Sequence, residues 1–296
     1  MIKIVIVGFG NIGKFALDAV TASKDMKLLG IVKRNALENE KIDDYPVISD
    51  VDKLSEKPDV ALLCTPTSAV LQEAQKYHKL GISTVDCFDR HQDILMLRKE
   101  LEKSTKENGV KAIISAGWDP GSDSVVRTLL EAIAPKGITN TNFGSGMSMG
   151  HSVVAKSFEG VKKALSMTIP LGSSLHRRMV YVELEDGADF AKIEKQILEH
   201  DSFSHDDSHV VQVSDVDSLM DMGHGVVIER KGVSGNTHNQ LIEFKMKINN
   251  PAATSQIMVG CARAIIKQPV GVYTMIELPP VNMLEGTLEE NIKKLV

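Results

Sequence analysis

The chain has 296 residues, of which 43% are hydrophobic and 25% are charged, and its formal net charge at pH 7 is -5. This composition is that of an ordinary globular protein long enough for two domains, and it argues against the disordered, fibrous and membrane classes. A net negative chain has no surplus of cations to neutralise phosphates, which argues against a dedicated nucleic-acid binder.

The cysteines and the first apolar run indicate the compartment. Cys64, Cys87 and Cys261 are widely spaced and form no Cys-x-x-Cys pair, so they predict neither a disulfide framework nor a zinc cluster. The run Ile4–Val7 is too short for a signal-peptide core or a membrane span. We therefore expect a cytoplasmic protein.

The first part of the chain alternates short apolar runs with longer amphipathic stretches, as parallel βαβ units do. The predicted strands are Lys3–Val7, Lys27–Val32, Val60–Cys64, Thr84–Phe88 and Lys111–Ser115. The predicted helices are Ile12–Ala22, Ser68–Lys79 and Asp93–Asn108. We predict an α/β fold whose first domain, residues 1–118, is a Rossmann doubly wound parallel sheet.

After Trp118 the predicted strands follow one another without a helix between each pair. They are Arg178–Leu184, Val210–Val213, Val226–Lys231 and Leu241–Ile248. Two helices, Asp189–Glu199 and Ala252–Lys267, are expected to cover one face of this mixed or antiparallel sheet. Residues 119–269 would then form an α+β domain for substrate binding and dimerisation. Within residues 270–296, the strand-like Val272–Leu278 would return to the first domain.

A glycine motif follows the first predicted strand and opens a helix. Glycines in this context let the backbone approach a pyrophosphate at the helix N-terminus, although a turn without a ligand is the alternative. The residues expected to bind a dinucleotide here are Gly8, Gly10, Asn11, Ile12 and Gly13.

The residues that follow the second predicted strand bear on the choice of cofactor. NAD-type motifs have an acidic residue about 20 residues beyond the glycines, where it accepts from the ribose 2′-hydroxyl. Lys33 and Arg34 stand there instead. A carboxylate would repel a 2′-phosphate, whereas an arginine holds it through paired N–H groups, so we predict NADP. A solvated basic pair is the alternative.

Further residues at strand ends are expected to line the cofactor, because doubly wound sheets bind ligands at the carboxyl edge of their strands. They are Cys64, Thr65, Pro66, Thr67 and Ser68, together with Phe88 and Pro120. Capping of the next helix by these Ser and Thr residues is an equally good explanation, and for Ser68 alone it is the favoured one.

Two carboxylates, Asp89 and Asp119, follow strand ends in the first domain. A carboxylate there suits a protonated amine, because it accepts hydrogen bonds from the amine and helps it to lose a proton. A turn-forming role is the alternative for Asp119, which precedes Pro-Gly. Asp86 is a second candidate acid near Asp89, or else a buried structural acid that holds the loop. Trp118, the only tryptophan, is expected to shape the pocket beside Asp119.

At these residues the sequence resembles the meso-diaminopimelate dehydrogenases, and the similarity spans nearly the whole chain. The shared strings are the glycine motif, Thr84-Val-Asp-Cys-Phe-Asp89, Gly117-Trp-Asp-Pro-Gly121 and Gly146-Met-Ser-Met-Gly-His-Ser152. The resemblance implies reversible NADP-dependent oxidative deamination at the D-configured centre of meso-2,6-diaminopimelate. The products would be L-2-amino-6-oxopimelate and ammonia, and the enzyme would be a homodimer.

The resemblance also assigns roles to single residues. It makes Asp89 and Asp119 the partners of the reacting amine. The residues that it implies around the D-centre are Trp118, Phe143, Met149 and Gly150. Those that it implies at the distal L-centre are Thr168, Arg178, His224 and Asn250. Without the resemblance, Arg178 would be explained as part of a surface pair, His224 as a loop residue and Asn250 as a helix cap.

Two positions depart from the pattern expected of the strictly specific family members. Those members are expected to have a bulkier aromatic residue at the position of Phe143 and a glutamine at that of Met149. The chain thus resembles the permissive branch, which also aminates simple 2-oxo acids to D-amino acids, since lost polar contacts relax the rejection of smaller substrates.

Two other functions stay open at this point. One is another Rossmann reductase of lysine or aspartate metabolism, although a His-His-x-x-Lys motif of the dihydrodipicolinate reductases is missing. The other is a non-catalytic NADPH sensor. A cluster of His200, His205, Asp206, Asp207 and His209 has metal-binding residue types. Nicotinamide chemistry needs no metal, so we expect a solvated loop and no metal site.

Overall fold

The computed structural model describes residues 1–220 and 223–296, which form two compact units. Unit 1 contains residues 1–128 and 251–296, and unit 2 contains residues 129–250. The sequence placed these divisions at 118/119 and 269/270. The difference arises because the first turns of the helix Ser122–Ile133 belong to unit 1, and because the helix Asn250–Ile266, except for its first residue, also belongs to unit 1.

The strands of unit 1 form one sheet in the order β15-β7-β6-β5-β1-β2-β4-β3. Their bounds are β1 Ile2–Val7, β2 Met26–Val32, β3 Lys41–Ile42, β4 Tyr45–Ile48, β5 Val60–Leu63, β6 Ser83–Asp86, β7 Lys111–Ile113 and β15 Gly271–Tyr273. All neighbouring pairs are parallel except β3 with β4. The predicted Rossmann sheet is confirmed, although β6 and β7 end two residues earlier than expected.

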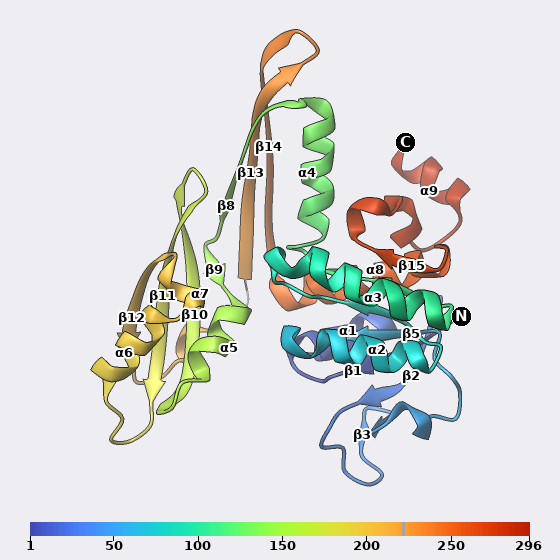
Figure 1. Ribbon diagram of the computed structural model, residues 1–296, viewed down its shortest axis with the longest axis horizontal. Coiled ribbons are helices and arrows are strands. Elements are labelled where there is room, and N and C mark those ends of the chain that lie inside the picture. The colour runs from blue at the N-terminus through green and yellow to red at the C-terminus, as the bar shows by residue number, and fades with distance from the viewer. Residues whose placement is uncertain (221–222) are drawn as a thin grey trace. The chain divides into compact units, whose positions relative to one another are not determined.

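Helices cover both faces of this sheet, α1 Asn11–Thr21 and α8 Asn250–Ile266 on one face and α2 Val70–Lys79 and α3 Ile94–Asn108 on the other (Figure 1). Two further helices are α4 Ser122–Ile133 and α9 Leu288–Leu295. Side chains of a strand alternate between the two faces. Ile4 and Ile6 of β1 therefore pack with α1 and α8, whereas Val5 and Val7 pack with α2 and α3.

The position of α8 corrects one expectation. Met258, Val259, Cys261 and Ala262 are fully buried in the same cluster as β1, so the helix covers the Rossmann sheet and not the sheet of the second domain. Helical periodicity showed that one face of this segment is apolar, but periodicity does not say which sheet the apolar face meets.

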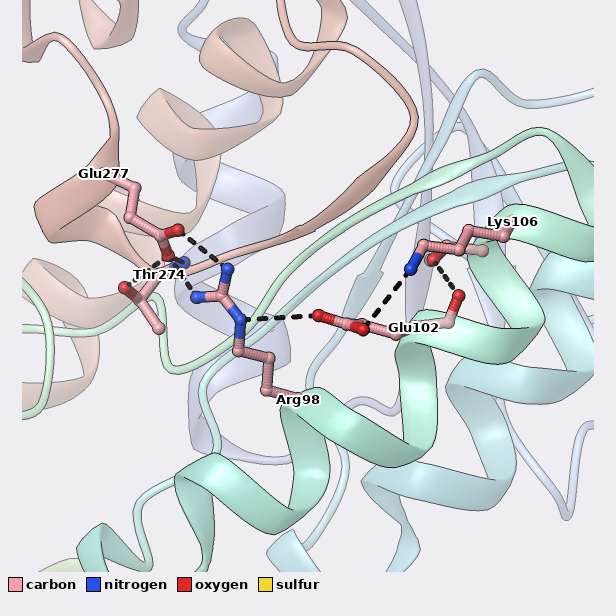
Figure 2. A network of polar contacts seen from close by, with 6 residues as sticks. Arg98, Glu102, Lys106, Thr274 and Glu277 are labelled. Atoms are coloured by element: carbon pink, nitrogen blue, oxygen red, sulfur yellow. Dashed lines mark hydrogen bonds and ion pairs between the residues drawn. The ribbon is translucent and has the colours of Figure 1, made fainter.

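The C-terminal segment belongs to unit 1, where the expected strand Val272–Leu278 is shorter: β15 ends at Tyr273 and is followed by the 3-10 turn Met275–Glu277. Figure 2 shows how polar contacts fasten it to α3: both terminal nitrogens of Arg98 contact the carboxylate of Glu277, at 2.5 and 2.8 Å. The backbone and hydroxyl of Thr274 also donate to Glu277, at 2.8 and 2.9 Å. Because the arginine binds both oxygens, the pair fixes the direction in which this segment leaves β15.

Unit 2 contains two sheets and the helices α5 Met149–Lys156, α6 Phe190–Glu199 and α7 Asp201–Ser204. The first sheet has the order β12-β11-β10-β9, with bounds β9 Gly146–Met147, β10 Val161–Gly172, β11 Leu175–Leu184 and β12 Asp207–Gln212. Its pairs are antiparallel except β11 with β12, so the sheet is mixed. Ile193, Ile197 and Phe203 from the helices pack with Val180 and Val182 of β11.

The second sheet of unit 2 is antiparallel, in the order β14-β13-β8, with bounds β8 Lys136–Phe143, β13 Gly223–Ser234 and β14 Thr237–Asn249. Its long hairpin is drawn in orange in Figure 1. The predicted combination of a Rossmann sheet with a mixed and antiparallel α+β part is therefore confirmed. Within the residues described, no helix has the length and hydropathy needed to cross a membrane.

Candidate active site

The three motif glycines have different surroundings at the turn between β1 and α1. Gly8 has φ +92°, and a Cβ there would lie 2.5 Å from the carbonyl oxygen of Cys64. A Cβ at Gly13 would lie 2.3 Å from the carbonyl oxygen of Gly8. A Cβ at Gly10 would meet no atom within 4 Å. Gly8 and Gly13 thus allow close chain packing, whereas Gly10 leaves open space before the helix N-terminus, which fits a dinucleotide pyrophosphate.

The two basic residues after β2 differ in their contacts. The ammonium group of Lys33 pairs with Glu40, which also accepts a hydrogen bond of 2.9 Å from the backbone of Leu37. Arg34 is exposed. Lys33 is therefore committed to a loop contact, and Arg34 is the better candidate for a 2′-phosphate.

The loop after β5 connects the expected cofactor residues with Asp89. Pro66 is the N-cap of a 3-10 turn, Thr67–Ala69, and the hydroxyl of Thr67 donates to Oδ1 of Asp89. Cys64 and Thr65 are half-buried, whereas Ser68 is exposed within the turn and caps neither it nor α2. The ends of β5 and β6 thus bring Thr67 and Asp89 together at the carboxyl edge of the sheet.

Asp86 and Asp89 have distinct environments. Asp86 is fully buried, and its Oδ1 accepts hydrogen bonds of 3.0 Å from the backbone N–H groups of Phe88 and Ser115. Burial raises the pKa of Asp86 to about 6, against the opposing effect of those two hydrogen bonds. Asp86 therefore ties the loop after β6 to the end of β7, whereas Asp89 is exposed to solvent.

Asp119 lies in a cluster of titratable groups that follows the buried Trp118. Its two oxygens lie 3.7 Å from Nε2 of His91 and 3.8 Å from Nη1 of Arg127. The same Nη1 lies 2.6 Å from Asp123, whose side chain is fully buried. The peptide bond between Asp119 and Pro120 is cis.

The two acids of this cluster hold protons with different strength. Burial alone would raise the pKa of Asp119, but hydrogen bonds with His91 and Asp123 and the charges of His91 and Arg127 lower it below its usual value. Burial and the neighbouring Asp119 instead raise the pKa of Asp123. Hydrogen bonding to Asp119 raises the pKa of His91, although its partial burial opposes this shift. The pKa of Asp119 is thus lowered and that of Asp123 is raised, because each acid affects the protonation of the other.

The sequence reasoning missed His91, Asp123 and Arg127. A signal for two of them was available, because Asp119, Asp123 and Arg127 are spaced by four residues and the last two share one side of α4. His91 carried no such signal. It enters the cluster because β6 and β7 are neighbours in the sheet, so the loops that follow them lie side by side.

A second group of predicted residues gathers in unit 2. The ring of Phe143, at the end of β8, lies 5.5 Å from that of His176 and 6.5 Å from that of His224. The backbone of Phe143 donates to Nε2 of His176 at 2.8 Å. Thr168 on β10 stands directly opposite Arg178 on β11, and both are buried. His176 is a further member that the sequence reasoning missed.

The other predicted residues of unit 2 lie at helix ends. Met149 opens α5 and packs against Met147, Leu165 and Val216. Gly150 is exposed next to it. Asn250 is the first residue of α8.

The acids and histidines of residues 200–209 make contacts of their own. Asp206 pairs with Arg178 at 2.6 Å, and Asp207 pairs with Arg177 at 2.7 Å and with His209 at 2.8 Å. His200 packs edge-on against Phe158. Across residues 1–220 and 223–296, no group of three or more His, Cys, Asp or Glu side chains is placed to hold a metal ion.

Comparisons with known proteins match both parts of the chain. The model of an oxidoreductase family with an NAD-binding Rossmann fold matches residues 2–88. The model of the diaminopimelic acid dehydrogenase C-terminal domain matches residues 117–178.

Similar proteins and structures extend this match to the full length. A meso-diaminopimelate D-dehydrogenase of Bacteroides fragilis is 54% identical over 297 residues, covering 100% of this chain and 99% of that protein. One of Corynebacterium glutamicum is 30% identical over 321 residues, covering 99% and 98%. The solved structure of C. glutamicum DAP dehydrogenase in complex with DAP gives a TM-score of 0.91 at 29% identity, covering 100% and 99%. An engineered D-amino acid dehydrogenase bound to NADP+ gives 0.88 at 27% identity, again covering 100% and 99%.

Proposed function

The chain belongs to the meso-diaminopimelate D-dehydrogenases, oxidoreductases that act on a CH–NH2 group, and from this premise we propose its reaction. It oxidatively deaminates the D-centre of meso-2,6-diaminopimelate with NADP, in the setting of lysine biosynthesis, and the reaction is reversible. The observation in the structure that carries the proposal is the cluster of Asp119 with His91, Arg127 and the buried Asp123, because a carboxylate held there can accept hydrogen bonds from a protonated amine.

The residues around the proposed cofactor site fit NADP. Gly10 leaves room for the pyrophosphate, and the uncapped N-terminus of α1 follows it. Arg34 is proposed to hold the 2′-phosphate, since Lys33 is paired with Glu40. The nicotinamide, when bound, supplies the acceptor for the hydride.

Asp119 is proposed to manage the proton of the reacting amine. Its carboxylate accepts hydrogen bonds from the ammonium group of the substrate, and loss of one proton from that group to water leaves the neutral amine from which hydride departs. Hydride loss gives an iminium, water adds to its carbon, and ammonia leaves as the ketone forms. Asp89 is proposed to orient the amine by hydrogen bonding, with Thr67 holding its Oδ1. The overall reaction takes up water and releases ammonium, NADPH and one proton.

The distal end of the substrate is proposed to bind to Thr168, Arg178, His224 and Asn250. Arg178 and Thr168 are buried neighbours on adjacent strands, so their donors are held in fixed directions for a carboxylate. Around the D-centre, we propose Trp118, Phe143, Met149 and Gly150. Phe143 and Met149 offer apolar surface there, which supports a permissive enzyme that also aminates simple 2-oxo acids to D-amino acids.

A cytoplasmic homodimer is the proposed form of the enzyme. On β14, the edge strand of its sheet, Ile242, Phe244 and Met246 share one face and remain partly exposed. A second copy packed on this face would bury them. Light scattering after gel filtration would give the mass of two chains, and the mass of one chain at micromolar concentration would contradict the dimer.

The test of function is the consumption of NADPH in the presence of ammonium and L-2-amino-6-oxopimelate. Ammonium-dependent consumption that yields the meso isomer supports the proposal, and Asp119→Asn should lose most of it. Consumption without ammonium would favour a reductase. Tight NADPH binding without turnover would favour a sensor.

A further inference from the structure

The guanidinium of Arg178 is already bound to an acid of the chain itself. Its Nε and Nη2 contact the same oxygen of Asp206, at 2.7 and 2.6 Å. Its Nη1 donates to the hydroxyl of Thr168 at 3.3 Å. An arginine has more N–H donors than these contacts use, so donors on Nη1 and Nη2 remain for a second carboxylate.

The surroundings make Asp206 the counter-ion of this arginine. Only 11% of the Arg178 side chain is exposed, against 29% for Asp206. Two histidines face the pair, His151 from α5 and His176 from β11. Burial lowers the pKa of His151 to about 4 and also lowers that of His176, so both rings are neutral at pH 7. The charge of Arg178 is therefore balanced by that of Asp206 before any substrate binds.

This balance has a consequence for substrate choice. A nearly buried arginine without a counter-ion is costly, so a site that lacked Asp206 would depend on the carboxylate of the substrate. With Asp206 present, a substrate without a distal carboxylate leaves Arg178 paired. A substrate with one brings a second negative charge close to Asp206.

We propose that Asp206 is a specificity-determining residue, which broadens the substrate range by satisfying Arg178 internally. It weakens the preference for a distal carboxylate and makes small amino acids acceptable. The inference rests on the proposed function, in which Arg178 binds the distal carboxylate. It adds an electrostatic origin of permissiveness to the apolar one at Phe143 and Met149.

The chain contains a matched control. Arg177 directly precedes Arg178, and Asp207 directly follows Asp206. Nε of Arg177 donates to Oδ2 of Asp207 at 2.7 Å, the same distance as between Nε of Arg178 and Asp206. The side chains of Arg177 and Asp207 are 44% and 43% exposed, because neighbouring residues of a strand point to opposite faces. Asp207→Asn therefore removes the same type of charge one residue further along the chain, at an exposed pair that does not include Arg178 or Thr168.

The experiment compares kcat/KM for meso-diaminopimelate with kcat/KM for D-alanine, which has no distal carboxylate. Asp206→Asn should raise this ratio about fivefold to tenfold, mainly through a lower KM for meso-diaminopimelate. Asp206→Glu, which restores the charge, should return the ratio towards that of the wild type, and Asp207→Asn should not change it. Asp206→Ser removes the charge with a smaller side chain and serves if the asparagine variant does not fold.

Arg178→Gln separates the two possible failures. If it lowers the ratio while both neutral variants of Asp206 keep the wild-type ratio, Arg178 binds the distal carboxylate but the role of Asp206 is refuted. If Arg178→Gln leaves the ratio unchanged, the proposed distal site is wrong and the inference falls with it. An equal loss for both substrates in the neutral variants would show a purely structural role and would also refute the inference.

Discussion

The substitution Asp86→Asn tests how burial acts on an acid at the carboxyl edge of the sheet. Asp86 is fully buried, and burial raises its pKa from 3.8 to about 6, although the N–H groups of Ser115 and Phe88 donate to it. The folded chain therefore holds this proton more tightly than the unfolded chain does. Its contribution to stability is complete below pH 3.8 and is lost as the pH rises through about 6. The loss amounts to about 3 kcal/mol.

Asparagine keeps the acceptor oxygen for both N–H groups but cannot ionise. We expect Asp86→Asn and the wild type to differ little in stability at about pH 4, where both side chains are neutral. Near pH 8 the variant should be more stable than the wild type by up to about 3 kcal/mol. Urea unfolding across this range measures both free energies. A difference between the two proteins that does not change with pH would refute the reasoning.

Three further predictions concern the cofactor site and the C-terminal segment. Gly10→Ala should change stability by less than about 1 kcal/mol yet weaken NADPH binding about tenfold or more. Gly13→Ala should instead lower the melting temperature, because of these two positions only Gly13 has backbone atoms where the new Cβ would lie. Calorimetry and NADPH titration measure the two effects, and equal effects of the two variants would contradict the distinction. Arg34→Ala should raise KM for NADPH without raising KM for NADH. Lys33→Ala should raise KM for NADPH by a smaller factor, since Lys33 pairs with Glu40. A larger rise in KM for NADPH with Lys33→Ala than with Arg34→Ala would exclude Arg34 as the phosphate ligand. Arg98→Ala should lower the unfolding free energy by about 1 kcal/mol, because its pair with Glu277 is partly exposed, and should leave KM values unchanged.

Much of unit 1 was predictable because β1, β5, β6 and β7 are short, mostly buried runs that end in a glycine or polar loop. The short strands β3 and β4 are mostly exposed or half-buried, and the sequence analysis missed them. The pattern of β1, β2 and β5 depends only on local sequence. The place of α8 was not predictable in this way. Its apolar residues, such as Met258 and Ala262, show that it packs, but its partner is a sheet whose central strand contains Ile4 and Ile6, more than 200 positions earlier. Tertiary contacts of that kind leave no periodic signal.

The sequence could propose Asp89 and Asp119 as candidates because both lie in loops that follow strands of the sheet. The contacts that set their chemistry come from chain segments that meet only in the fold. His91 reaches Asp119 because β6 and β7 are neighbours. Asp206 lies 28 positions after Arg178 in the sequence and reaches it because β12 pairs with β11. In the sequence alone, Asp206 belonged to a loop with the residue types of a metal site.

The most direct test of the central claim follows the hydrogen of the D-centre. With meso-diaminopimelate deuterated at that centre and NADP+, the account predicts NADPH that carries the deuterium and L-2-amino-6-oxopimelate as the product. Deuterium retained in the organic product, or oxidation of the L-centre instead, would contradict it.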